Sequence, residues 1–300
     1  MTLRHLRIFI AVCDEHGMTR AAEKLHITQP SVTQAVRELE EHYGLLLFER
    51  LGRRLYLTAA GEELLHYARH IVQLDAQIET AMRDFGEKFR LRIGASVTIG
   101  EAVLIELLRY LKKNAPALEI FSEIHNTAEL EQMVLKDELD LALVEGKITS
   151  EYLREIPFME DELIFVDGTQ NGIAPLRSAE QLRNMVFFVR EEGSGTRKLF
   201  EQEMQRKNIP FKLAGVYNNA EGIKKAVRAG LGVTVISKRT VAEELRRGEL
   251  LEFSVAGVKF KRNFRMICHR NKYISQGLQC FMDACACMEK ILDEAEQGGK

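Results

Sequence analysis

Long apolar runs are missing from this 300-residue chain, although 46% of its residues are hydrophobic. No stretch approaches the roughly 20 apolar residues that a membrane-spanning helix requires. The amino-terminal segment reaches Asp14 and Glu15 before it builds the apolar stretch of a secretion signal. We therefore expect a cytoplasmic protein rather than a membrane or secreted one. Its length allows a sizeable core and two or three domains.

Charge of one sign and cysteine are also scarce. The formal net charge is −2, so the protein cannot coat nucleic acid through bulk positive charge, and any contact with DNA must be local. The 5 cysteines form neither a zinc knuckle nor a CxxC pair. We expect buried or half-buried thiols, with metal or redox sensing through Cys280, Cys285 and Cys287 as the alternative. Low-complexity segments and fixed-period repeats are absent from the sequence.

Three helical patterns fill the first part of the chain. In the first two, apolar residues recur at helical spacing, and the second starts near Met18 with Thr19 as a candidate cap. A third begins at Thr28, which can also cap, and it tolerates Pro30 because the first turn of a helix has no use for that N–H. The spacing predicts two short helices joined by a tight turn.

The third helix has two chemically different faces. Its apolar face consists of Val32, Ala35, Val36 and Leu39. The opposite face carries side chains whose hydrogen-bonding groups and lengths suit base edges and phosphates, namely Gln29, Ser31, Thr33, Gln34 and Arg37. Such a pair of helices is typical of a helix-turn-helix, which places its second helix in the major groove of DNA.

A basic hairpin is predicted after these helices. Leu55 and Leu57 alternate beyond a Gly-containing turn, which favours a small wing whose Arg50, Arg53 and Arg54 could reach flanking phosphates or the minor groove. Without the preceding helices the same basic cluster would be interpreted as a solvated turn.

A long helical pattern without proline runs from Thr58 to about Phe85. Its apolar stripe consists of Leu64, Leu65, Ala68, Ile71, Val72, Ile78 and Met82. Such a stripe needs a partner, and a second copy of the helix is the simplest one. We therefore expect dimerisation through this segment.

The remainder of the chain changes character. Short apolar runs alternate with helical patterns at 91–94, 118–124, 140–144, 163–166, 186–189 and 233–236. This alternation indicates α/β units around mostly parallel sheets. Strands near residues 163 and 264 would cross between two lobes.

Two loops are candidates for ligand binding, because ligands of open α/β sheets collect where strands end and helices begin. One follows the first strand, and the other, rich in glycine, follows a strand of the second lobe. Glycines allow a close backbone approach and hydroxyls can donate, so the two loops together would hold a small oxyanion or carboxylate between the lobes. Polar residues after two further strands could add donors or accept from a hydroxyl or amine. The candidates are Ser96, Val97, Thr98, Asn126, Thr127, Glu145, Gly193, Ser194, Gly195, Thr196 and Arg197.

Structural explanations compete with these assignments. The serines and threonines could be helix caps. The carboxylate of Glu145 could be solvated or salt-bridged, and Arg197 could pair with Glu191 or Glu192 instead of binding an anion.

Catalysis and metal binding find little support in the sequence. Ser194 lies outside a GxSxG elbow, and no histidine and carboxylate are visibly placed to activate it. His66 and His70 have a spacing that can bind metal, but with no third ligand apparent we assign them to a helix surface. We expect neither an enzyme nor a metal or cofactor. A solute-binding protein is a further alternative for the α/β part alone, and the helix-turn-helix argues against it.

The order of these parts resembles the LysR-type transcriptional regulators over essentially the whole chain. The matching stretches are 6–9, 18–25, 28–40, 47–50 and 57–61, and together they are highly specific. The resemblance implies a winged helix-turn-helix at 1–57, a linker helix at 58–88 and, at 89–300, a two-lobed effector-binding domain like periplasmic binding proteins. Lobe I would comprise 89–162 and 268–300, and lobe II 163–267.

The resemblance also carries expectations about partners. It adds Pro30 to the residues at the DNA groove. It implies homotetramers built as dimers of dimers, binding to imperfect palindromes near promoters, and RNA polymerase as a candidate partner. The glycine-rich stretch of the second lobe resembles that of members controlling sulfur assimilation or carbon fixation.

Overall fold

The computed structural model describes residues 1–51, 54–83, 89–171 and 175–298. The chain divides into two compact units, which are described separately. The first comprises residues 1–88 with the short segments 135–137 and 271–273, and the second comprises the rest. No helix within the described ranges is long and apolar enough to cross a membrane.

Three helices form the core of the first unit, α1 (Leu3–Asp14), α2 (Met18–Lys24) and α3 (Gln29–Tyr43). The predicted inner face of α3 is buried as a whole and packs with Ala21 and Ala22 of α2 into one apolar cluster. The predicted helix-turn-helix is therefore confirmed. The predicted cap of α2 was wrong, because Gly17 takes the N-cap position and Thr19 lies inside the helix.

A two-stranded hairpin follows, made of β1 (Phe48–Leu51) and β2 (Arg54–Leu57), which pair antiparallel with Phe48 opposite Leu57. Glu40 of α3 holds its start, because Oε1 accepts hydrogen bonds from the backbone N–H groups of Leu47 (2.8 Å) and Phe48 (3.3 Å). Helix α3 and the start of the hairpin are thus joined by one carboxylate.

Helix α4 (Ala59–Arg83) continues the first unit, and its apolar stripe is divided between two environments. Ala68 is buried in the helix-turn-helix core, and Leu64, Leu65 and Val72 pack against it. The remaining stripe residues Ile71, Ile78 and Met82 are exposed, by 41%, 53% and 63%. The prediction that the whole stripe awaits a second copy was therefore wrong for its first half, which the chain covers itself.

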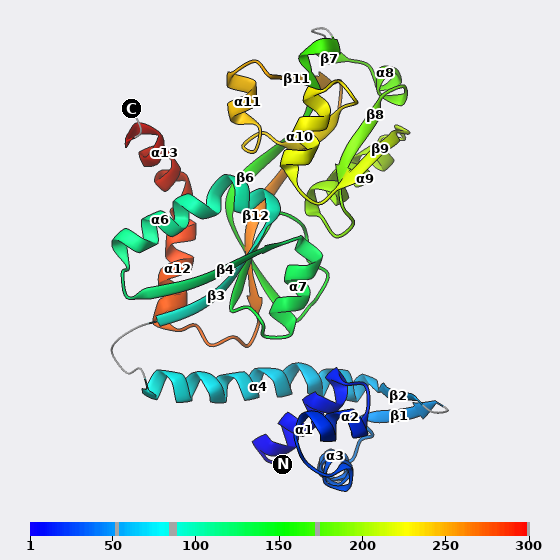
Figure 1. Cartoon of the computed structure of the whole chain (residues 1–300), viewed down its shortest axis with the longest axis vertical. Helices are drawn as coiled ribbons and strands as arrows, with labels where there is room; N and C mark the ends of the chain where they lie inside the picture. The colour runs from blue at the N-terminus through cyan, green and yellow to red at the C-terminus, as the bar shows by residue number, and fades with distance from the viewer. Residues whose placement is uncertain (52–53, 84–88, 172–174, 299–300) are drawn as a thin grey trace. The chain divides into compact units, whose positions relative to one another are not determined.

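One sheet forms the first half of the second unit. Strands β3 (Phe89–Ser96), β4 (Leu118–His125) and β5 (Leu141–Val144) are parallel, with β3 in the middle. Three helices cover one face, α6 (Ile105–Asn114), α12 (Gln276–Ala286) and α13 (Met288–Gly298), and α7 (Thr127–Leu135) covers the other (Figure 1). A short helix α5 (Val97–Ile99) and the π-helical turn η1 (Gly100–Leu104) join β3 to α6.

Two long strands carry the chain into the second lobe and back, β6 (Leu153–Gly168) and β12 (Phe260–His269) (Figure 1). They pair antiparallel from Phe260 opposite Leu163 to His269 opposite Leu153. The predicted crossings near residues 163 and 264 are confirmed. The sheet order β4-β3-β5-β12-β6-β11-β7 is nevertheless mixed rather than mostly parallel, because a crossing pair must run in opposite directions.

The second lobe has apolar clusters on both sides of its strands. Phe200 and Met204 of α9 (Gly195–Arg206) belong to one cluster, and Ile223 and Val227 of α10 (Ala220–Arg228) to the other. Its strands are β7 (Leu176–Arg177), β8 (Val186–Arg190), β9 (Lys212–Tyr217), β10 (Thr234–Ser237) and β11 (Leu250–Val255), with short helices η2 (Thr169–Asn171), α8 (Ala179–Arg183) and α11 (Ala242–Arg246). The parallel pair β8 and β9 ends at the start of α9 and α10, where the predicted second-lobe loop lies.

The thiols are mostly enclosed, as expected. Cys13, Cys268 and Cys285 are buried and Cys280 is partly so, whereas Cys287 is exposed. No group of three metal-ligating side chains occurs in the ranges that the structure covers. Of the two helix histidines, His70 is buried, which corrects its assignment to a helix surface.

Candidate functional sites

The outer face of α3 is exposed. Its six candidate residues, Gln29, Pro30, Ser31, Thr33, Gln34 and Arg37, are all exposed. Their polar groups are engaged only along the helix itself: Gln34 donates to Glu38 (2.9 Å) and Arg37 to Glu41 (2.7 Å). Exposed pairs of this kind contribute little to stability, so their donors can be exchanged for groups of a bound partner at small cost.

The start of this helix is arranged by hydroxyl groups. Thr28 occupies the N-cap position, but its Oγ1 bonds the Ser31 hydroxyl (2.8 Å) instead of a backbone N–H. Gln29 donates to Thr33 at 2.9 Å. The first turn thereby presents amide and hydroxyl groups on one surface.

The wing arginines are only partly covered by the structure. Arg50 lies in β1 and Arg54 in β2, at backbone level. Arg53 lies outside the described residues, so its role remains a prediction from sequence.

The polar residues predicted for ligand binding meet where the strands of both lobes end. Ser96 closes β3, Asn126 and Thr127 follow β4, and Glu145 follows β5, while Thr196 enters from α9 of the second lobe. All except Asn126 are at least 95% buried. The structure thus brings first-lobe and second-lobe candidates into one enclosed place.

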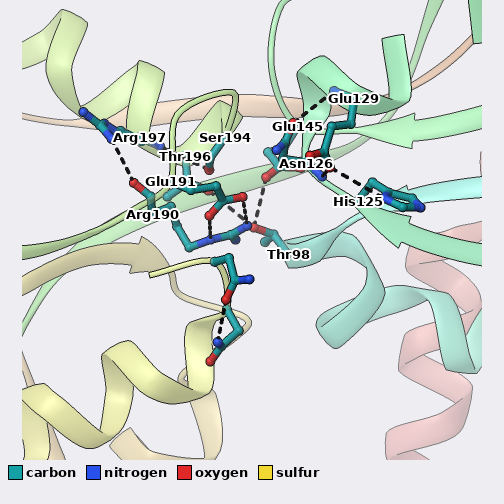
Figure 2. Close-up of polar contacts among 12 residues, drawn as sticks. Thr98, His125, Asn126, Glu129, Glu145, Arg190, Glu191, Ser194, Thr196 and Arg197 are labelled. Carbon is teal, nitrogen blue, oxygen red and sulfur yellow. Dashed lines mark hydrogen bonds and ion pairs between the residues drawn. The ribbon is translucent and has the colours of Figure 1, made fainter. Parts of the chain in front are cut away.

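Hydrogen bonds that join Thr98 to Glu145 and to Thr196 link the two lobes there (Figure 2). The Thr98 hydroxyl donates to Glu145 Oε1 at 3.2 Å and lies 3.3 Å from the Thr196 hydroxyl, which accepts from Arg262 Nη1 at 2.9 Å. A guanidinium only donates, so the chain has a direction: Arg262 donates to Thr196, Thr196 to Thr98, and Thr98 to Glu145. One end of the site is therefore a donor and the other an acceptor.

Arg262 joins the candidate residues through Thr196 and was not predicted from the sequence. It lies on crossing strand β12, and its Nε donates to Asp161 Oδ2 of β6 at 2.7 Å. Asp161 also accepts from the Ser237 hydroxyl at 2.6 Å. A signal existed, because Phe260 and Phe264 are both buried and the period of two places Arg262 on the same inward face.

Four polar atoms in this region have no hydrogen-bond partner among the residues that the structure describes. They are Ser96 Oγ, Thr127 Oγ1, Glu145 Oε2 and Arg262 Nη2. Buried polar groups are nearly always paired, and each unpaired one is costly. Three of these atoms belong to the first lobe, and the fourth belongs to crossing strand β12.

The electrostatics of the site are balanced between acid and base. Burial raises the pKa of Glu145, while the positive charges of Arg262 and Arg190 act against that rise. Arg190 itself is held by Glu191 through two hydrogen bonds of 2.7 Å (Figure 2). Arg262 has a donor, Nη2, that no described residue uses.

Some of the residues predicted to bind a ligand cap helices instead, as the competing structural explanation proposed. Ser194 accepts from the Arg197 backbone N–H, and Asn126 Oδ1 accepts from the Glu129 backbone N–H, so both cap helices. Ser96 occupies an N-cap position without a side-chain cap bond. Arg197 was expected to pair with Glu191 or Glu192 if it did not bind an anion, but it donates to Glu201 at 2.7 Å.

The glycines of the second-lobe loop allow close contact with the first lobe. Gly193 has a φ of +88°, which favours glycine, and its carbonyl accepts from the Ala128 backbone N–H at 3.2 Å. A methyl group on Gly195 would lie 2.9 Å from the backbone nitrogen of Gly146. Val97, by contrast, is a half-buried residue at the start of α5 with no polar side-chain group.

Family models match both parts of the chain. The bacterial regulatory helix-turn-helix protein, lysR family, matches residues 3–62, and the LysR substrate binding domain matches residues 86–288. The chain belongs to the LysR family of transcriptional regulators. This LysR-type regulator therefore combines a DNA-binding helix-turn-helix with an effector-binding domain, as the resemblance implied.

Curated relatives include both branches that the second-lobe loop resembles. The RuBisCO operon transcriptional regulator of Allochromatium vinosum is 32% identical over 287 residues, covering 94% of this chain and 95% of that protein. The HTH-type transcriptional regulator CysL of Bacillus subtilis is 33% identical over 266 residues, covering 87% and 89%.

Solved structures share the fold of this LysR-type regulator. Full-length CbnR complexed with target DNA has a TM-score of 0.60 at 20% identity, covering 97% of this chain and all of that one. The CcmR regulatory domain of Synechocystis PCC6803 in complex with 2-PG has a TM-score of 0.61 at 24% identity, covering 66% and 96%.

Proposed function

We propose that this LysR-type regulator is controlled by a small anion bound between the two lobes of its effector domain. The observation that carries the proposal is the cluster of buried polar atoms that have no partner among the described residues, three of which belong to groups able to donate: Ser96, Thr127 and Arg262. An anion would accept from all three. The complex of CcmR with 2-PG supports the proposal, because a protein of this fold binds a small molecule.

Arg262 supplies the positive charge in this proposal. Its side chain is 5% exposed and its Nε is already used by Asp161, so Nη2 is the atom left for a ligand. A guanidinium matches the geometry of carboxylates, phosphates and related oxyanions. The hydroxyls of Ser96, Thr98, Thr127 and Thr196 complete the binding set, with Ser194 and Asn126 holding the loops around it.

DNA binding is assigned to the outer face of α3 and to the wing. Gln29, Ser31, Thr33 and Gln34 have the lengths and groups for base edges, and Arg37 suits phosphates. In this proposal Arg50, Arg53 and Arg54 position the wing and set the salt dependence of binding.

The domain limits and the oligomer belong to the same proposal. We place the winged helix-turn-helix at 1–57, the linker at 58–88, lobe I at 89–162 with 268–300, and lobe II at 163–267. The exposed half of the α4 stripe, Ile71, Ile78 and Met82, is the surface for a second copy. Two such dimers would form a tetramer on promoter DNA, and RNA polymerase would be a further partner.

Ligand control requires unequal affinity for two arrangements of the protein. Each lobe contributes part of the site, and one hydrogen bond between the hydroxyl groups of Thr98 and Thr196 joins the lobes directly. A ligand that replaces or reinforces this bond changes either the closure of the lobes or their packing between subunits. That change would alter the spacing of paired DNA-binding heads.

A thermal-shift screen tests the proposal with sulfate, sulfite, phosphate, thiosulfate, phosphorylated sugars and short carboxylates at constant ionic strength. A ligand that prefers the folded state raises the melting temperature, by an amount that grows with concentration. The shift should disappear in Arg262→Met and in Thr196→Ala, while operator binding without ligand stays intact. Arg265→Met is the matched control, because Arg265 lies on the same strand but pairs with Glu155 at 3.0 Å. An unchanged shift in Arg262→Met would remove the cation from the site.

A further inference from the structure

The two ends of the proposed site make opposite demands on a ligand. Arg262 Nη2 is a donor without an acceptor, and Glu145 Oε2 is an acceptor without a donor, among the described parts of the chain. Both side chains are enclosed: Glu145 is 4% exposed and the Arg262 side chain 5%. Water therefore cannot reach either group freely, and each needs its own partner.

The hydroxyl groups of Thr196 and Thr98 lie between Arg262 and Glu145, and they leave the site with a donor at one end and an acceptor at the other. The directed chain from Arg262 through Thr196 and Thr98 ends on Glu145 Oε1, so it satisfies one nitrogen of the guanidinium and one oxygen of the carboxylate. Asp161 accepts from a second nitrogen, Nε, so the third nitrogen, Nη2, and the second carboxylate oxygen, Oε2, are the atoms without partners among the described residues. Ser96 and Thr127 can each donate or accept and so adapt to either end.

An anion that carries acceptors but no donor would pair with Arg262 and leave Glu145 without a partner. Its charge would also lie near the Glu145 carboxylate, whose remaining oxygen would still lack a donor. Repulsion between like charges is strong where water is excluded. A ligand that carries both a negative group and a hydroxyl, ammonium or acid proton meets both demands.

We infer that the effector is a small anion that also carries a hydrogen-bond donor, with its anionic group on Arg262 and its donor on Glu145. This inference rests on the proposed anion site and narrows its ligand class. Glu145 thus selects among anions by requiring a donor, and Arg262 supplies the general attraction for negative charge.

Matched ligands that differ in one hydroxyl group test the inference on the full-length protein by titration calorimetry. The pairs are glycolate with acetate, lactate with propionate, and 2-hydroxyethyl phosphate with ethyl phosphate, and sulfate serves as a donor-free reference. We expect the hydroxylated member to bind about 10- to 100-fold more tightly, the range for a hydrogen bond to a charged group.

The variant Glu145→Gln removes the negative charge and should reduce the preference to below about 3-fold, because the donor-free anions gain affinity. Glu131→Gln is the matched control, since Glu131 is a second buried acid of the same lobe whose carboxylate accepts from Thr149 and Ser150 instead of from Thr98. The control should retain the full preference. Circular dichroism would establish that both variants are folded.

The possible outcomes separate the two ideas. Equal affinities within each pair, or tightest binding by sulfate, would overturn the inference and leave the anion site standing. If no anion binds, including sulfate and inorganic phosphate, the proposed site fails together with the inference.

Discussion

Replacing Asp161 by asparagine tests the ion pair that positions Arg262. The Asp161 side chain is fully buried and that of Arg262 is 5% exposed, with 2.7 Å between the carboxylate oxygen and Nε. Asparagine can still accept from Ser237. Its NH2 group, however, would face the N–H of Arg262 Nε, so that two donors meet and the buried positive charge loses its counterion. Breaking a buried pair from one side costs about 3–5 kcal/mol.

Urea unfolding followed by circular dichroism would measure this loss. With a slope of about 2–3 kcal/mol/M, a cost of about 3 kcal/mol lowers the unfolding midpoint of the effector domain by roughly 1 M. Glu243→Gln is the control, because Glu243 pairs with Arg246 on an exposed helix surface and its loss should leave the midpoint unchanged.

Phosphate should then restore part of the lost stability of Asp161→Asn, because it supplies the counterion that Arg262 has lost. The gain must exceed that of Glu243→Gln in the same buffer, which corrects for the general effect of salt. A midpoint for Asp161→Asn within error of wild type would refute the reasoning, since it would mean that the buried pair does not hold the arginine.

Three further predictions concern other parts of the chain. Gln34→Ala should weaken binding to cognate operator about 10-fold more than to random DNA in a fluorescence anisotropy titration, and equal losses would remove Gln34 from base readout. Gly61→Ala should lower the melting temperature of the helix-turn-helix, because the new methyl group would lie 2.2 Å from the Leu47 carbonyl oxygen; an unchanged melting curve would contradict the close packing. Burial raises the pKa of Cys13 to about 12, so at pH 8 it should stay a thiol and resist a disulfide reagent while exposed Cys287 reacts; fast labelling of Cys13 would show that its burial is transient.

Local patterns explain why the DNA-binding part was predictable. The two faces of α3 are separated by helical periodicity alone, and the buried set Val32, Ala35, Val36 and Leu39 agrees with it residue for residue. The division of the α4 stripe was not predictable in this way. Whether Ala68 packs on the same chain or on a copy depends on where α4 lies against the first helices, and periodicity carries no such information.

The part of the candidate ligand site that lies at strand ends was predictable from the sequence. Ser96, Thr98, Glu145 and Thr196 were found because polar residues stood after apolar runs. Arg262 was missed because its role depends on pairings across the sequence: its hydrogen bond to Thr196 spans 66 residues and the one to Asp161 spans 101. No local pattern records such separations, although the inward position between two buried phenylalanines was a usable sign.

The crossing pair β6 and β12 also sets an order in which the protein can fold during synthesis. Strand β12 is the neighbour of β5 in the first-lobe sheet, and Phe281 of the later helix α12 lies in the core beside it. The first lobe therefore stays open at one sheet edge while the whole second lobe is translated, for on the order of ten seconds at about 5–20 residues per second. During that interval the helix-turn-helix is already able to fold, because its apolar cluster consists of described residues between Leu6 and Val72. The nascent chain thus acquires its DNA-binding head before its ligand site exists.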